Sequence, residues 1–274
     1  MSVTKLVLIL PLMAAFAYVL LVGLMYLSQR ALLYPGASPT LAPEHARWGE
    51  SIFIRTPDGE TLHGLYRRGE SGKPSVLFFL GNADRASNYG FLAQALAARG
   101  IGLLAISYRG YPGSTGSPSE DGLLTDGIAA FDWLFIRTEG QIVVLGQSLG
   151  SGVAINTAAQ RPAAAVILVS AYLSVLSLAQ TYYPFVPVAL LVKDPFRSDL
   201  RIAKLRQPKL FIHGRRDDII PLSSGEALYC IAPEPKQMRI YDGSGHNDIW
   251  YDDTIGQVIR FVEALKRDIT RAAP

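Results

Sequence analysis

The sequence predicts an α/β protein whose mostly parallel central sheet carries helices on both faces, preceded by one membrane-spanning helix. Three observations predict this fold class. The chain starts with a long uncharged apolar stretch, then alternates short apolar strands with helical segments, and places a Gly-x-Ser-x-Gly motif between one such strand and helix. With 274 residues it is long enough for one large domain of this class plus an extension.

The N-terminal segment predicts a membrane anchor over residues 1–28. From Leu6 to Leu27 no side chain is charged, and about 20 apolar residues span a bilayer core as a helix. A cleaved signal peptide is the alternative because Ala15–Ala17 resembles a cleavage site, but the apolar stretch continues well past it. Lys5 precedes the span and Arg30 follows it, and we expect the rest of the chain on the exported side.

After the anchor, residues 29–49 are rich in Pro and Ala and predict a linker, so the globular domain is expected at residues 50–274. A Pro-Asp-Gly turn at 57–59 predicts a hairpin, and the later strands alternate with helices as in a parallel sheet. The expected strands are 51–55, 61–67, 75–80, 101–108, 142–145, 164–170, 209–213 and 237–241. The expected helices are 85–98, 121–137, 151–160, 223–231 and 253–269.

Residues 171–206 interrupt this alternation and predict a small cap-like insertion. The segment follows a strand end, where sheets of this class bind their ligands, and it carries aromatic side chains at Tyr182, Tyr183 and Phe185. Two interpretations stay open. The segment either lines a pocket for an apolar group or packs against the sheet as ordinary core.

The most informative motif is Gly146–Gly150, which reads Gly-Gln-Ser-Leu-Gly. The apolar run Ile142–Leu145 precedes it and the small-residue stretch Ser151–Gln160 follows, so the motif lies at a strand-to-helix turn. Such a turn is too tight for side chains at the two glycines and lifts the Ser148 hydroxyl into a cleft. The motif alone has low specificity, because a glycine-rich connection without chemistry shows the same pattern.

A serine nucleophile needs a base, and the chain has four histidines. His45 lies in the linker, His63 lies in the early hairpin, and His213 ends a strand where we expect a buried support for a turn. His246 follows the last predicted strand within Gly243–Asp248, a loop of small residues at the carboxyl edge. His246 is therefore the expected base.

The orienting acid is expected in the loop that follows the strand at 209–213. Either Asp217 or Asp218 would face the same edge, although a lone aspartate in a loop is more often a turn or cap residue. The chain order Ser148, aspartate, His246 at three predicted strand ends matches a known order of a catalytic triad. This agreement is much harder to obtain by chance than the serine motif alone.

Two backbone N–H groups are expected to stabilise the oxyanion of a tetrahedral intermediate. One is that of Leu149, directly after the nucleophile, and the second comes from the loop Leu80–Ala83. Gly81 permits a close approach there. Asn82 is the expected donor, with Ala83 as the alternative.

From about Ser51 to Arg267 the chain resembles an α/β-hydrolase of the bud-emergence (Bem)-like group, which is similar to membrane-associated depalmitoylating hydrolases of eukaryotes. The matching segments are Leu80–Ala83, Tyr108–Glu120, Gly146–Gly150, His213–Gly214 with Asp217, and Gly245–Asp248. The resemblance implies an α/β-hydrolase fold and a serine hydrolase that acts on esters or thioesters. It also implies Asp217 rather than Asp218 as the acid, and an N-terminal anchor is common in the group.

The chain departs from the group at two positions. Leu80 stands where the group usually has histidine, a side chain that supports the loop and does not attack, so we expect a retuned oxyanion loop with activity retained. Pro112 stands where the group usually has glycine and would stiffen the loop at 108–120. That loop is expected to end in a helix cap at Ser117 or Ser119, and no Gly-Lys-Ser/Thr follows to make it a phosphate loop.

Composition narrows the possible partners and cofactors. The net charge of +3, with no long basic run, gives no indication of a nucleic-acid partner. The single cysteine, Cys230, excludes an internal disulfide, and its helix-like surroundings predict a buried thiol. We expect no metal and no organic cofactor, since triad chemistry needs neither.

The expected function is that of a membrane-anchored serine hydrolase. It would cleave small-molecule or lipid-like acyl esters or thioesters through a Ser-His-Asp triad and an acyl-enzyme intermediate. An aminopeptidase-like hydrolase is an alternative, although no evident acidic cluster would bind a substrate amine. A non-catalytic, membrane-tethered binding protein on the same fold is the other alternative, because a fold does not imply a function.

Overall fold

A computed structural model describes residues 3–38 and 41–272, with side chains from Leu10 to Leu265 apart from the same gap. One eight-stranded sheet has the order β1-β2-β4-β3-β5-β6-β7-β8. β1, β2 and β4 pair antiparallel, and every pairing from β4 through β8 is parallel, which confirms the predicted mostly parallel sheet. The strands are β1 Glu50–Arg55, β2 Thr61–Arg67, β3 Ser75–Phe79, β4 Gly102–Ile106, β5 Ile142–Gln147, β6 Ala165–Val169, β7 Lys209–Gly214 and β8 Lys236–Tyr241.

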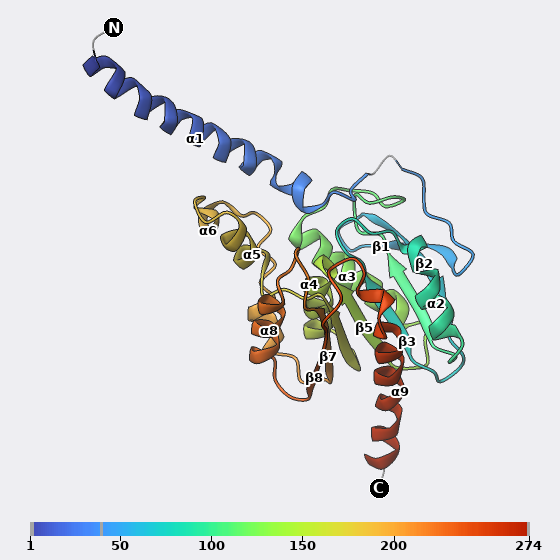
Figure 1. Ribbon diagram of the computed structural model, residues 1–274. Helices are drawn as coiled ribbons and strands as arrows, with labels where there is room; N and C mark the ends of the chain where they lie inside the picture. Colours follow the sequence, from blue (N-terminus) through green and yellow to red (C-terminus); the bar gives the residue numbers. More distant parts are fainter. Residues whose placement is uncertain (1–2, 39–40, 273–274) are drawn as a thin grey trace.

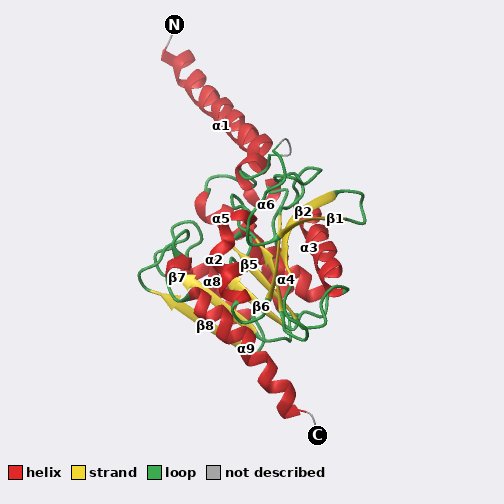
Figure 2. Ribbon diagram, turned by 90° about the vertical axis from the view of Figure 1, so that its right-hand side faces the viewer, coloured by secondary structure: helices red, strands yellow, loops and turns green. Residues whose placement is uncertain are grey.

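Helices cover both faces of the sheet (Figure 2). Successive residues of β5 belong alternately to two apolar clusters, because neighbouring side chains of a strand point to opposite faces. The clusters are packed by α3, α4 and α8 on one face and by α2 and α9 on the other. These helices are α2 Gly90–Ala97, α3 Glu120–Phe135, α4 Leu149–Gln160, α8 Leu222–Ile231 and α9 Thr254–Ala272, with short 3-10 turns at η1 Ala86–Tyr89 and η2 Ile249–Tyr251.

The first helix, α1 (Val3–Leu33), projects away from the sheet, at the opposite end of the molecule from α9 (Figure 1). Its residues Leu10–Leu33 form a candidate membrane span of 24 residues with mean hydropathy 2.1. The helix therefore continues past residue 28, into the segment expected as linker. The rest of that segment packs on the domain, where Tyr34 and Trp48 are buried.

The insertion at 171–206 contains three short helices, α5 Val175–Tyr182, α6 Val188–Leu191 and α7 Ser198–Ile202. α7 packs against α4 and α8, whereas α5 and α6 stand out beside α1 (Figure 1). The end of the segment is thus packed against other helices, as in the second interpretation, whereas its first two helices protrude from the domain. We refer to α5 and α6 as the cap.

The prediction of a buried Cys230 is wrong, because the thiol is exposed. α8 buries Gly225 and Leu228, which lie three residues apart on one face of the helix. Cys230 follows Leu228 by two residues, which turns it by roughly 200° about the helix axis and onto the outer face.

Candidate active site

Ser148 lies at the turn between β5 and α4, with φ of 51° and ψ of −123°. A non-glycine residue with positive φ is uncommon, and a strained backbone of this kind concentrates at functional sites. Ser148 is the N-cap residue of α4, yet its side chain makes no capping hydrogen bond to the helix. The hydroxyl is therefore available for a partner other than its own helix.

The two motif glycines leave no room for side chains. A Cβ placed on Gly146 would overlap the Gly150 carbonyl oxygen, and a Cβ on Gly150 would overlap the Phe79 carbonyl oxygen at the end of β3. The overlaps are with backbone atoms, which cannot move as a flexible side chain can. The predicted tightness of the turn is thus found in the structure, and it draws the serine turn and the loop after β3 together.

The imidazole of His246 lies between the serine and an aspartate. Its Nε2 is 3.0 Å from Ser148 Oγ, and its Nδ1 is 2.8 Å from Asp217 Oδ2. All three side chains are buried, although they come from loops after three different strands, β5, β7 and β8. The parallel sheet brings them together because these strands end at the same edge.

Asp217 is held as an acceptor of hydrogen bonds. Burial raises its pKa, but hydrogen bonds from His246 and from the Ile220 N–H favour the ionised form, and together they leave the pKa below its ordinary value. Its Oδ1 accepts the N–H groups of Ile219 at 3.1 Å and Ile220 at 2.7 Å. The carboxylate is thereby kept charged and correctly oriented toward the imidazole.

His213 is buried and supports this loop, as predicted. Its Nε2 lies 2.9 Å from the Ile220 carbonyl oxygen, and burial lowers its pKa, so the ring is held neutral as a donor to that carbonyl. The same nitrogen is 3.5 Å from Asp217 Oδ2, a contact that no sequence pattern predicts.

The remaining candidates lie outside the cluster. Asp218 is exposed, and its backbone carbonyl oxygen accepts the Tyr182 hydroxyl at 3.0 Å. His45 is exposed, and the buried His63 pairs through Nε2 with Ser51 at 2.8 Å. Of the two aspartates, the one that contacts the imidazole is Asp217, which the family resemblance implied.

The loop after β3 lies against the serine turn. A Cβ placed on Gly81 would lie 3.7 Å from Ser148 Cβ. Among the described residues, no hydrogen bond uses the backbone N–H of Leu149, Asn82 or Ala83. Both sides of the cleft therefore have free donors, and Asn82 and Ala83 remain alternatives for the second one.

Three contacts that sequence reasoning missed hold Asn82 in place. Its carbonyl oxygen accepts the Tyr111 hydroxyl at 2.7 Å and the Gly36 N–H at 3.1 Å. Its side-chain amide donates to the Leu33 carbonyl oxygen at the end of α1, at 3.1 Å. The loop is thus braced directly by the end of α1. Tyr108 adds a hydrogen bond of 2.9 Å to the carbonyl of Leu80, the residue that stands where the group usually has histidine.

A further carboxyl group lies beside this loop. Asp84 Oδ2 is 2.8 Å from the position of a Cβ on Gly81, and it accepts the Tyr89 hydroxyl at 2.9 Å. Burial raises the pKa of Asp84, despite this hydrogen bond. A pattern search for triads could not have found this residue, because only the turn after β3 brings it to the cleft.

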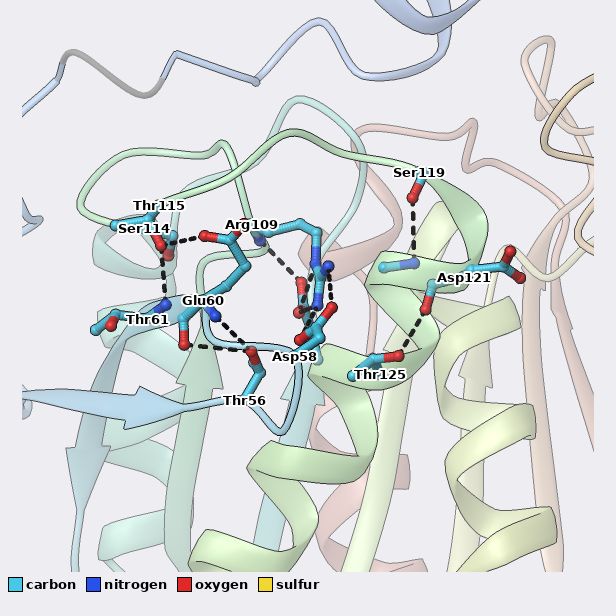
Figure 3. A network of polar contacts seen from close by, with 12 residues as sticks. Thr56, Asp58, Glu60, Thr61, Arg109, Ser114, Thr115, Ser119, Asp121 and Thr125 are labelled. Carbon is cyan, nitrogen blue, oxygen red and sulfur yellow. Dashed lines mark hydrogen bonds and ion pairs between the residues drawn. The ribbon is translucent and has the colours of Figure 1, made fainter.

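The loop after β4 is held by Arg109 (Figure 3). The guanidinium donates to both carboxylate oxygens of Asp58 in the β1–β2 turn, at 2.7 and 3.1 Å, and to the buried Asp126 of α3 at 2.9 Å. Ser119 caps α3, since its Oγ accepts the Gly122 N–H at 3.2 Å. Of the two predicted cap residues, the structure selects Ser119, and the loop serves as a support.

An apolar groove of about 380 Å³ opens between the end of α1 and the cap. Leu33 from α1, Leu178 from α5 and Val188 from α6 line it, together with Ile219 from the loop that carries Asp217. Grooves of roughly 300–1,000 Å³ lined by apolar side chains are typical of small-molecule sites. No group of three or more His, Cys, Asp or Glu side chains in the described ranges is arranged to hold a metal ion.

Comparisons with known proteins agree with this geometry. Residues 70–202 match a family model described as serine aminopeptidase, S33. The chain is 38% identical to an uncharacterized Mycobacterium tuberculosis protein over 96% of both chains. It is 31% identical to protein bem46 of Schizosaccharomyces pombe over 90% of both.

A Pyrococcus furiosus esterase shows the same fold, with a TM-score of 0.68 at 19% identity over 85% of this chain and 98% of the esterase. The predicted fold class is thus confirmed, as are the hydrolase class and the family on which the resemblance rested. The chain belongs to the Bem46-like group of the α/β-hydrolases and is a hydrolase.

Proposed function

We propose that this protein is a membrane-anchored serine hydrolase that cleaves carboxylic esters or thioesters. The observation that carries the proposal is the continuous chain of contacts from Asp217 through His246 to Ser148, with distances of 2.8 and 3.0 Å. This is the arrangement in which an imidazole removes a proton from a serine hydroxyl.

In the first half of the reaction Ser148 Oγ attacks the acyl carbonyl carbon and His246 Nε2 takes its proton. Asp217 holds the imidazole in the tautomer with Nδ1 protonated and stabilises its charged form. The carbonyl oxygen becomes an oxyanion, which the N–H groups of Leu149 and Asn82 stabilise. Collapse of this intermediate expels the alcohol or thiol, which receives the proton from His246.

In the second half, water attacks the acyl-enzyme. His246 takes a proton from the water as the new carbon–oxygen bond forms, and it returns that proton to Ser148 Oγ when the ester bond to the enzyme breaks. The products are the free acid and the regenerated serine. The residues need no metal or organic cofactor for either half.

The membrane anchor is supported by the length of α1, which runs as one apolar helix past the cleavage-like Ala15–Ala17 to Leu33 and is joined to the cap by polar contacts near its end. Arg30 pairs with the buried Asp194 at 2.8 Å, and Gln29 Oε1 accepts the Lys193 N–H at 2.8 Å. We propose that α1 is retained, because its candidate span of 24 residues is long enough to cross a bilayer. We also propose that the catalytic domain lies on the exported side, in the orientation expected from the sequence.

Labelling with a fluorophosphonate probe tests the catalytic proposal. Wild-type protein is expected to react at Ser148, as identified by mass spectrometry, and Ser148→Ala is expected to show no labelling and at least about 10⁴-fold lower esterase activity. Circular dichroism of both proteins checks that the fold is intact. Equal labelling of the two proteins, or esterase activity retained in the variant, would refute the assignment.

The name of the matching family favours one second candidate, an aminopeptidase-like activity. Paired assays with acyl esters and aminoacyl amides separate the two candidates. Faster turnover of amides with a free amino group would favour the peptidase. Folded wild-type protein that neither reacts with the probe nor turns over either substrate would favour a binding protein instead.

Cys230 allows a direct test of orientation, because it is the single cysteine of the chain and its thiol is exposed. A membrane-impermeant maleimide applied to intact cells is expected to label it if the domain is exported. Labelling only after the cells are lysed would place the domain on the inner side.

A further inference from the structure

We infer that the anchor helix and the cap together form the binding groove for the long acyl chain of a membrane-held substrate. The inference deepens the proposed function and rests on it, since Ser148 must act on the carbonyl group of that chain. It assigns to α1 a second role beyond anchoring, as one wall of the substrate site.

The chemistry of the groove selects an apolar ligand. Met25, Leu32 and Leu33 of α1 face Leu178 and Ala179 of α5 across it. Three polar side chains along its wall are already engaged within the protein. Gln29 donates to the Leu191 carbonyl oxygen at 3.2 Å, Tyr182 donates to the Asp218 carbonyl oxygen at 3.0 Å, and Asp194 accepts from Arg30. These groups have their partners, so the groove offers mainly apolar surface.

The inner end of the groove adjoins the catalytic loops at two points. Ile219 lines it and donates its backbone N–H to Asp217 Oδ1 at 3.1 Å. Leu33 lines it and accepts the side-chain amide of Asn82 through its carbonyl oxygen at 3.1 Å. An acyl chain in the groove would therefore have its carboxyl end beside the acid loop and the oxyanion loop.

The outer end lies beside the apolar part of α1. The Tyr18 hydroxyl donates to the Phe185 carbonyl oxygen at 2.7 Å, so the α5–α6 turn reaches a residue well inside the candidate span. Phe185 and Leu190 are 88% and 86% exposed, which in water would be an unfavourable arrangement for two large apolar side chains so close together in one cap. If α1 spans the bilayer, this cap meets lipid, and the groove opens where acyl chains reside.

A chain-length series measured on the full-length protein in lipid vesicles tests the inference. Wild-type kcat/KM is expected to rise from the butyrate to the dodecanoate ester of p-nitrophenol, because each buried methylene contributes about fourfold. Ala179→Trp fills the groove and is expected to lower the dodecanoate-to-butyrate ratio by at least about tenfold. Gln180→Trp is the matched control on the exposed side of α5 and should leave the ratio unchanged.

A second pair of variants tests the wall that α1 provides. Met25→Trp is expected to lower the same ratio, whereas Leu27→Trp, at an exposed position outside the groove, is expected to leave it unchanged. Comparing the kcat/KM for S-acyl peptides with that for oxygen esters of equal chain length shows whether the membrane-held acyl group is linked as a thioester or as an oxygen ester. A ratio that stays flat with chain length, or that changes equally in lining and control variants, would overturn the inference.

A binding measurement separates this inference from the proposed function. In Ser148→Ala protein, a photoreactive dodecanoic acid analogue is expected to crosslink to Met25 and Leu178, and Ala179→Trp is expected to suppress this. Probe labelling of wild-type Ser148 without such crosslinks would overturn the groove alone. Crosslinks in the groove without probe labelling would overturn the catalytic proposal and leave the groove as a lipid-binding site.

Discussion

The loops around Ser148 and the cap above them are built in opposite ways. Ser148, Asp217 and His246 are each less than 10% exposed and follow strands in the interior and at the edge of one sheet. The cap helix α5 buries no residue completely. It contacts α6, its half-buried Val175 and Leu178 pack against the edge of the core, and Tyr182 donates to the Asp218 carbonyl oxygen. The difference teaches that the proposed reacting groups are held by the sheet, whereas the groove proposed to contact the substrate is completed by α1.

The largest effect is expected at Asp217, the proposed acid among the buried side chains around Ser148. Asp217→Asn is expected to lower kcat/KM by about 10⁴-fold, because an amide holds the imidazole in the wrong tautomer. Asp218→Asn is the matched control one residue away and should change kcat/KM by less than about twofold, since its side chain is exposed. Esterase kinetics of the two variants check this, and similar losses would mean that Asp217 has no special role.

The rigidity of the serine turn is tested at Gly150. A methyl group there would overlap the Phe79 carbonyl oxygen and lie 2.6 Å from the Leu80 carbonyl oxygen, so Gly150→Ala is expected to destabilise the fold by about 1–3 kcal/mol. It should also lower esterase activity by displacing the oxyanion loop. Gly243→Ala is the control, because a Cβ on Gly243 meets nothing within 4 Å. Denaturant unfolding that gave equal stability for both variants would contradict this rigidity.

The dependence of the cap on α1 is tested at Arg30. Arg30→Gln removes the cation from the buried Asp194, which also accepts the Glu120 N–H at 3.0 Å, and is expected to cost about 1–2 kcal/mol in local stability. Hydrogen exchange in Val175–Leu191 should then be roughly tenfold faster. Arg161→Gln, which breaks the distant surface pair with Asp132, should leave this exchange unchanged. Equal hydrogen-exchange rates in wild type and both variants would show that the stability of the cap does not depend on its contact with α1.

The smallest expected effect concerns the ion pair between Arg109, in the loop after β4, and Asp58 in the β1–β2 turn. Hydrogen bonds from Arg109 hold the pKa of Asp58 down to about 2, so the pair stabilises the fold above the ordinary value of 3.8 and this contribution is lost as the pH falls toward 2. Asp58→Asn is expected to cost at most about 1 kcal/mol at pH 7, because Asp58 is nearly half exposed.

Thermal unfolding of the two proteins across this pH range checks the expectation. The difference between wild type and Asp58→Asn should shrink as the pH falls from about 4 toward 2. A difference that stayed constant over this range would show that the ionised pair has no such role.

Most elements could be predicted because their signals are local. The apolar runs of β3, β5 and β6 are buried on both faces and lie within one or two residues of the expected ranges. The predictions of burial differed from the structure where contacts between residues distant in the sequence determine whether a side chain is buried. Cys230 lies on the outer face of a correctly predicted helix, and the segment expected as linker packs on the domain because Tyr34 and Trp48 find apolar partners there.

By itself the sequence determined the alternation of strands and helices, the strand-to-helix turn at Ser148, and the chain order of serine, aspartate and histidine. These follow from side-chain periodicity and from the backbone freedom of glycine, which are properties of short segments. Only the tertiary structure decided that His213 lies 3.5 Å from Asp217, that Leu33 braces Asn82, and that α1 lines a groove with the cap. Such contacts join residues far apart in the chain, and their distances depend on how whole elements pack.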